Sequence, residues 1–116
     1  LATAMSESFA MADLAGIHRA DLYSIMSAGP LHSIMMDLVK GNGVDGNHNS
    51  LGFSIGNAHK DLGYYVSMAE ALNVHSDIGT GTKTSLESAV SEGKGDLDVP
   101  DMIAHFAEVF AKTAKL

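Results

Sequence analysis

Apolar residues recur at helical spacing along almost the whole chain, and no other property of the sequence restricts the fold as strongly. The pattern is clearest from about Phe53 to about Val74, where successive apolar residues are three or four positions apart and so share one helix face. The residues of this face are Ile55, Ala58, Leu62, Tyr65, Ala69 and Leu72. Runs of alternating β-branched residues, which are typical of strands, are missing. The sequence therefore predicts an all-α protein.

Glycine and proline residues between the apolar patterns predict where helices end. The expected stops are Gly16, Gly29–Pro30, Gly41 and Gly93. Two stretches rich in Gly with Asn or Thr, residues 41–52 and 78–83, are expected to be connections. The last helix is expected from about Pro100, because proline suits the first turn. We therefore expect residues 1–116 to form a single domain, a bundle of about six helices.

The charge balance and the absence of cysteine exclude several classes of function. The formal net charge is -7 and the seven Lys and Arg residues form no cluster, so we expect no nucleic-acid and no membrane partner. No apolar run is long enough for a membrane span. The lack of cysteine excludes disulfides and zinc–thiolate sites and suits a cytoplasmic protein.

Three stretches match parts of known binding motifs but lack the surroundings that those motifs need. Residues 41–46 carry the letters of the dinucleotide fingerprint, yet a helix precedes them where the fingerprint needs a strand. Residues 45–56 begin like a calcium loop but have Ser50 and Gly56 where that loop has Gly and Glu. Residues 79–84 lack the Gly that precedes the Lys of a phosphate-binding loop. No two histidines lie four apart on a helix, so no metal site is expected.

The stretch GFSIGNAHKDL, which begins at Gly52, is the most informative one for function. Phe53 lies about two helical turns before Lys60, so the ring and the ammonium group can share one helix face. Asp61 follows directly and places a carboxylate beside the cation. Two interpretations are open: these three side chains line a pocket for a charged ligand, or a core Phe lies beside a solvated Lys–Asp pair.

Two glycines, Gly56 and Gly63, lie inside the helix predicted for this region, where glycine lowers helix stability. Close approach of another backbone or of a ligand would explain them. Simple tolerance would explain them equally well.

Three segments, in order along the chain, resemble β-hydroxyacid dehydrogenases, the family that includes 3-hydroxyisobutyrate dehydrogenase. The family's first helices and small-residue turn are matched by SESFAMADLAGIHRADLYSIMSAGP. Its GF…KDL…A…A…G-V stretch is matched by LGFSIGNAHKDLGYYVSMAEALNV, and its closing segment by SLESAVSEGKGDLDVPDMIAHF. The resemblance covers nearly all of the chain.

The resemblance implies that the chain is the α-helical C-terminal domain of a two-domain enzyme. In the family, an N-terminal Rossmann domain binds NAD or NADP, and the C-terminal domain closes over the substrate and makes much of the dimer interface. A helix between the domains carries the catalytic Lys in a GxGxxxKxxxN motif, and matching Glu7 to the family's Glu places that Lys before Leu1. The parent enzyme would pass a hydride between NAD or NADP and a small β-hydroxy acid or its semialdehyde. Residues 1–116 alone are expected to have no catalytic residue, no turnover and no bound cofactor.

The resemblance also implies roles for the residues of the GFSIGNAHKDL stretch. Phe53 lies where the family has an aromatic residue beside the substrate and the nicotinamide, and Asp61 where an acid supports the active site. Lys60 lies where a Lys reaches the cofactor, a role that suits a mobile point charge. The chain departs from the family at residues 75–78, where a Pro-containing turn is usual, and at residues 48–50, which replace an Asp-Pro pair. Both departures bear on substrate specificity.

The start of the chain leads to two further expectations. The helical spacing begins at Leu1 with no capping Ser, Asp or Asn before it, so we expect a helix cut from a longer one. Met5, Phe9 and Ala12 are then expected to be exposed and to support a homodimer or higher assembly. The alternatives to an enzyme domain are a free-standing helical interaction module and a regulatory domain that binds a small acid near Lys60.

Overall fold

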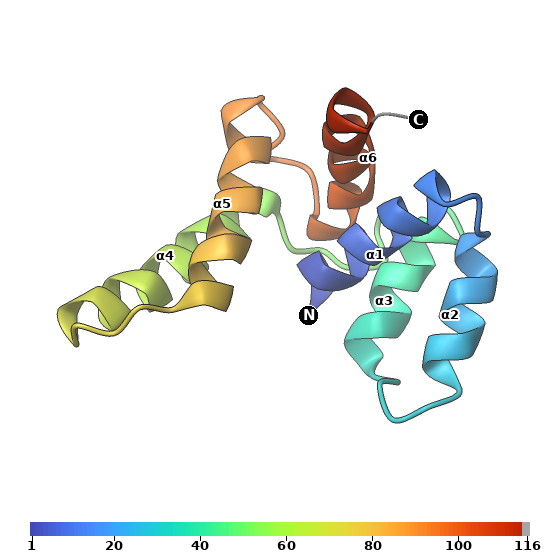
Figure 1. The fold of residues 1–116 in the computed structure, drawn as a ribbon, viewed down its shortest axis with the longest axis horizontal. Coiled ribbons are helices and arrows are strands. Elements are labelled where there is room, and N and C mark those ends of the chain that lie inside the picture. The colour runs from blue at the N-terminus through green and yellow to red at the C-terminus, as the bar shows by residue number, and fades with distance from the viewer. Residues whose placement is uncertain (115–116) are drawn as a thin grey trace. The chain divides into compact units, whose positions relative to one another are not determined.

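The chain is all-α, as the sequence predicts. The structure, a computed structural model, describes residues 1–114. Its helices are α1 (Ala2–Leu14), α2 (Arg19–Ser27), α3 (Ile34–Gly43), α4 (Ile55–Ala71), α5 (Asp77–Ser91) and α6 (Met102–Thr113), with a short 3-10 helix η1 (Val99–Asp101) before α6 (Figure 1). Among the described residues, the one bridge of β type joins Ser54 and Asp98. None of the described helices is both long and apolar enough to cross a membrane.

The chain divides into two compact units. The first contains residues 1–52 and the chain from Val99 onward, and the second contains residues 53–98. In the first unit, α1 packs against α3, α6 and η1, and α2 packs against α1 and α3. In the second unit, α4 and α5 pack along each other as a helical hairpin (Figure 1).

The core of the first unit forms where α1 meets α3 and α6. Its buried apolar residues include Met5, Phe9, Ala10, Ala12, Met36, Val39, Met102, Ile103 and Phe106. The helices approach each other closely: a Cβ atom on Gly43 would lie 2.7 Å from Cδ1 of Ile103 and 3.2 Å from Cδ2 of Phe9. Any side chain at this position would force Ile103 and Phe9 to shift, which explains a glycine at the end of a packed helix.

The expectation that Met5, Phe9 and Ala12 are exposed is wrong. Their exposed fractions are 6%, 0% and 4%, because α3 and α6 cover this side of α1. Leu1, by contrast, is 92% exposed. An apolar helix face next to the start of the chain is therefore filled from within the first unit, and these three residues offer no surface for self-association.

The predicted helix stop at Gly41 is also wrong, because α3 continues to Gly43. A Cβ atom on Gly41 would lie 2.8 Å from Cβ of Ser50, so the glycine allows the following loop to fold back onto the helix. The Oγ atom of Ser50 donates a hydrogen bond to the carbonyl of Leu38 at 2.6 Å and holds the loop there. Close packing, rather than helix termination, accounts for the glycine.

The predicted stops at Gly16 and Gly93 are confirmed. Both glycines have positive φ, 75° and 82°, the left-handed conformation that follows many helix ends. After α1, the amide of Ile17 donates to the carbonyl of Ala12 at 2.8 Å, which completes a Schellman motif. Asn73, with φ 57°, takes the same place after α4.

The second unit begins each of its helices with a serine cap. The Oγ atom of Ser54 accepts a hydrogen bond from the amide of Asn57 at 3.1 Å, and that of Ser76 accepts one from the amide of Gly79 at 3.3 Å. The buried apolar residues of the two helices are Ile55, Ala58, Val66, Ala69, Leu86 and Ala89. Tyr65 and Leu72, which the sequence places on the buried face, are 49% and 66% exposed. A single partner helix covers only one side of α4, so Val66 is buried there while Tyr65 lies at the edge of the contact and stays half exposed.

The predicted connection at residues 78–83 is wrong, because this stretch lies inside α5. The hydroxyl of Thr82 donates to the carbonyl of Ile78 at 2.9 Å, so it is satisfied within the helix. A Cβ atom on Gly79 would lie 2.8 Å from Cε1 of Tyr65. The glycine therefore serves close packing of α5 on α4.

The two explanations for the glycines of α4 apply to one residue each. The amide of Gly56 donates to the carbonyl oxygen of Gly95 at 2.9 Å, and a Cβ atom on Gly56 would lie 3.1 Å from that oxygen. Close backbone approach therefore explains Gly56. Around Gly63 no other atom would lie within 4 Å of an added Cβ, so simple tolerance explains it.

Candidate functional site

The three predicted site residues lie at the start of α4 in the second unit. Phe53 precedes the capping Ser54 and is 37% exposed, so it is not a core residue. Lys60 and Asp61 lie on the second turn of the helix, with Nζ of Lys60 4.0 Å from Oδ1 of Asp61. The structure thus brings the cation and the acid together and places the aromatic ring one residue before the helix cap.

The Lys60–Asp61 pair is open to solvent and weakly coupled. The side chains are 56% and 58% exposed. An ion pair at this distance and exposure contributes little to stability, because water screens it. Both side chains are therefore available to a ligand without loss of a structural contact.

A second polar cluster, which the sequence patterns do not reveal, joins α2 to α3 in the first unit. The hydroxyl of Tyr23 donates to Oδ1 of Asp37, and Nε2 of His32 lies 3.0 Å from both oxygens of the same carboxylate. Nζ of Lys40 lies 5.5 Å from the centre of the Tyr23 ring and 2.9 Å from Oδ2 of Asp45. Each polar group of the cluster is therefore occupied by a neighbour in the same unit.

These contacts shift the protonation equilibria of the cluster. The hydrogen bond from Tyr23 holds the pKa of Asp37 below its ordinary value, and His32 adds to this effect. The same hydrogen bond to the Asp37 carboxylate raises the pKa of Tyr23. The hydrogen bond to Asp45 raises the pKa of Lys40.

Replacing Tyr23 by phenylalanine should weaken the first unit in a pH-dependent way. Since the folded pKa of Asp37 is depressed, its contribution to stability is present above the unfolded pKa, about 3.9, and is lost as the pH falls through the folded value. The melting temperature of Tyr23→Phe should therefore lie below that of the wild type at about pH 7 and converge with it near pH 2. Thermal unfolding across this range measures the difference. Ser24→Ala, which removes an exposed hydroxyl from the same helix, is the control; a deficit that stays constant with pH would contradict the role of Asp37.

A cavity of about 310 Å³ with a mixed polar and apolar lining lies beside η1 in the first unit. Within it, Oδ1 of Asp101 accepts a hydrogen bond from Nδ2 of Asn42 at 3.1 Å and lies 3.2 Å from Nδ1 of His48. Arg19 also lines the cavity, and its Nη1 donates a hydrogen bond to the carbonyl of Gly43 at 2.9 Å. These bonds fasten the end of α3 and the loop after it to η1, so we assign the cavity a structural role.

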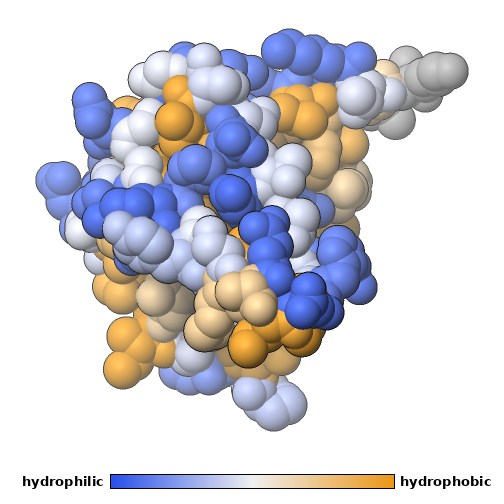
Figure 2. Space-filling view, turned by 90° about the vertical axis from the view of Figure 1, so that its left-hand side faces the viewer, coloured by the Kyte–Doolittle hydropathy of each residue, from blue (hydrophilic) through white to orange (hydrophobic). Residues whose placement is uncertain are grey.

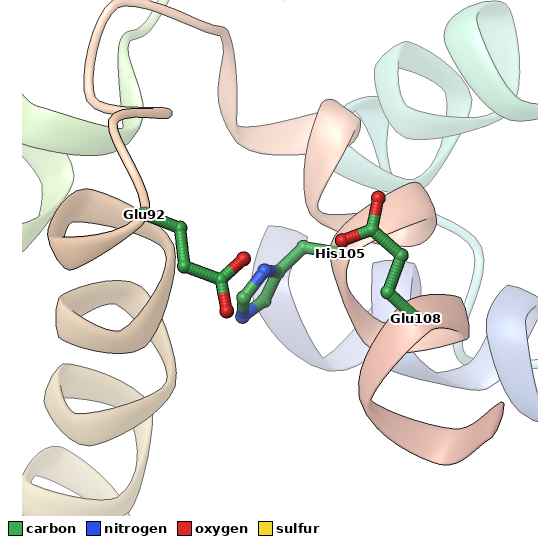
Figure 3. A group of neighbouring side chains, drawn as sticks. All are labelled: Glu92, His105 and Glu108. Carbon is green, nitrogen blue, oxygen red and sulfur yellow. The ribbon is translucent and has the colours of Figure 1, made fainter. Parts of the chain in front are cut away.

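Three side chains of the types that bind metals are drawn in Figure 3. Glu92 follows α5 in the second unit, whereas His105 and Glu108 lie one turn apart on α6 in the first. His105 is 2% exposed and belongs to the interior of the first unit. Because the three residues divide between the two units, we assign no metal site to them.

Comparison with protein families decides what kind of domain this is. A family model described as NAD-binding of NADP-dependent 3-hydroxyisobutyrate dehydrogenase matches residues 1–106. The chain belongs to this family. The match spans both units and includes Phe53, Lys60 and Asp61, and it confirms the resemblance to β-hydroxyacid dehydrogenases. A comparison with curated proteins gave no significant match. The all-α fold is thus that of an NAD(P)-binding domain of 3-hydroxyisobutyrate dehydrogenase-like enzymes.

Proposed function

We propose that the chain is the helical part of an NAD- or NADP-dependent oxidoreductase that acts on a small β-hydroxy acid or its semialdehyde. The family match across both units is the observation that carries this proposal. In the proposal, Lys60 contacts the cofactor, while Phe53 and Asp61 line or support the substrate side of the site. Turnover requires the nucleotide-binding domain of the parent protein, so residues 1–116 alone are expected to be inactive.

The exposure and charge of the three residues support these roles. The bound cofactor supplies or accepts the hydride. The ammonium group of Lys60 is exposed and has only a distant carboxylate beside it, so it fits an anionic group of a nucleotide. The half-exposed ring of Phe53 offers flat apolar surface that excludes water from a nicotinamide. Asp61 places a carboxylate beside Lys60 on the same turn of α4. None of the three is assigned the proton transfer of the reaction.

Replacing Lys60 by alanine should weaken cofactor binding in the full-length protein by at least about tenfold, since a charge-assisted hydrogen bond contributes roughly 1.5 to 3 kcal/mol. The dissociation constants of NADPH and NADH, measured by fluorescence titration, test this. Lys60→Arg keeps the charge and should retain part of the affinity, and Lys112→Ala, on α6 in the other unit, is the control. Unchanged affinity for both cofactors in Lys60→Ala would refute the proposed role.

We further propose that the protein self-associates through an apolar stripe of α4, made of Tyr64, Met68 and Leu72. These residues are four apart on one helix face and are 68%, 54% and 66% exposed. Hydrophobic residues reach the surface among hydrophilic ones in Figure 2. Light scattering should give the mass of a dimer or larger for the wild type and a smaller mass for Met68→Asp. A strictly monomeric wild type at high concentration would contradict this.

A further inference from the structure

His59, the residue before Lys60 on α4, carries a buried nitrogen without a hydrogen-bond partner among the described residues. Its side chain is 27% exposed, but Nε2 is closed off from solvent and has no hydrogen-bond partner among the described residues. A buried polar atom left unpaired costs free energy, and native structures pair nearly all such atoms. The placement of this ring therefore carries a cost in free energy, which points to a role beyond packing.

The carboxylate of Glu87, on α5, lies beside this nitrogen. Oε1 of Glu87 lies 4.0 Å from Nε2 of His59, about 1 Å beyond an N–H···O hydrogen bond. The Glu87 side chain is 63% exposed, so rotation about its own bonds can bring the carboxylate to the ring without moving either helix. A contact between these two residues would join α4 to α5 at the turn that carries Lys60.

We propose that His59 is a positioning residue for Lys60, through a hydrogen bond from Nε2–H to the carboxylate of Glu87. Consecutive residues of a helix are rotated by about 100° from one another. A bond from His59 to α5 would therefore fix the rotation of this turn of α4, and with it the direction in which the side chain of Lys60 leaves the helix. This inference rests on the proposed contact between Lys60 and the cofactor, and it adds the element that orients that contact.

Four variants of the full-length protein test the inference through cofactor affinity. His59→Leu removes the donor while keeping apolar volume, and Glu87→Ala removes the acceptor. Each should raise the dissociation constant of NADPH by up to about tenfold, the loss expected when the contact between Lys60 and the cofactor is no longer made. His59→Gln keeps a side-chain N–H of similar reach and Glu87→Gln keeps an acceptor, so both should stay close to the wild type. A packing role alone predicts the reverse order for His59, with Leu tolerated and Gln not, and that result would overturn the inference.

A spectroscopic measurement separates this inference from the proposed function. The 15N chemical shift of Nε2 in His59 reports its hydrogen bond with no cofactor present, and it should change in Glu87→Ala. The ring of His18, which is exposed in the first unit, is the control. If Lys60→Ala leaves cofactor binding intact, the proposed function fails while a changed His59 signal still supports the link to Glu87. An unchanged His59 signal in Glu87→Ala overturns the link itself.

Discussion

Replacing Phe9 by alanine is expected to lower the free energy of unfolding by roughly 3 to 5 kcal/mol, the usual cost of truncating an aromatic residue in a packed core. The Phe9 side chain has no exposed surface. Its ring lies against the end of α3, where ring carbons would be 3.2 and 3.4 Å from a Cβ on Gly43. Because α1 is held by both α3 and α6, no single helix can move in to fill the cavity. The loss is a large share of the roughly 5 to 15 kcal/mol that stabilises a typical protein.

Met11→Ala is the matched control for Phe9→Ala, because Met11 lies on the same helix and is 47% exposed. Its effect should stay within about 0.5 kcal/mol, as for most surface substitutions. Urea unfolding followed by circular dichroism gives both values. Equal losses in the two variants would show that α1 does not bury Phe9 in solution.

Replacing Gly79 by alanine is expected to destabilise the protein by roughly 1 to 3 kcal/mol, the cost of overpacking a tight contact. Helix propensity alone would predict that this substitution stabilises the protein, because alanine is a better helix former than glycine. The new Cβ would lie 2.7 Å from Oγ of Ser76 and 2.8 Å from Cε1 of Tyr65. Ser76 cannot give way without losing the cap of α5, and Tyr65 can do so only by leaving the contact with α5.

Gly81→Ala, two residues further along α5, separates the effect of the tight packing at Gly79 from the effect of helix propensity. No atom lies within 4 Å of a Cβ built on Gly81. Alanine should therefore stabilise the protein there by roughly 0.5 to 1 kcal/mol. Chemical denaturation of the two variants should give changes of opposite sign. Stabilisation by both would mean that α4 and α5 are not packed as closely as the structure shows.

Sequence patterns predicted the helices well where apolar spacing is regular and failed where glycines lie inside helices. Residues 41–43 and 78–83 look like connections because glycine commonly ends helices. In the structure, Gly43 and Gly79 mark places where a neighbouring helix or side chain comes too close for a Cβ. This closeness is a property of tertiary packing, and no local pattern carries it.

The candidate site shows the same division between local and tertiary information. Phe53, Lys60 and Asp61 lie within one short stretch, so a family motif alone was enough to propose them as site residues, and their roles stay a prediction. Tyr23 and Asp37 are separated by the α2–α3 connection and meet only because the two helices pack, so the sequence did not reveal their pairing. Which side of a helix is covered also depends on its neighbours, and for this reason the burial of Phe9 was predicted wrongly.

The first unit is discontinuous along the chain, and this determines the order in which it can form. A ribosome releases α1, α2 and α3 first, yet α1 lacks η1 and α6 until residues 99–113 have been made. The second unit is synthesised as one uninterrupted segment, so its hairpin has all of its partners earlier. Until α6 has been synthesised, Met5 and Phe9 lack the α6 side of their core. For a nascent chain this apolar helix is the part most in need of protection from aggregation.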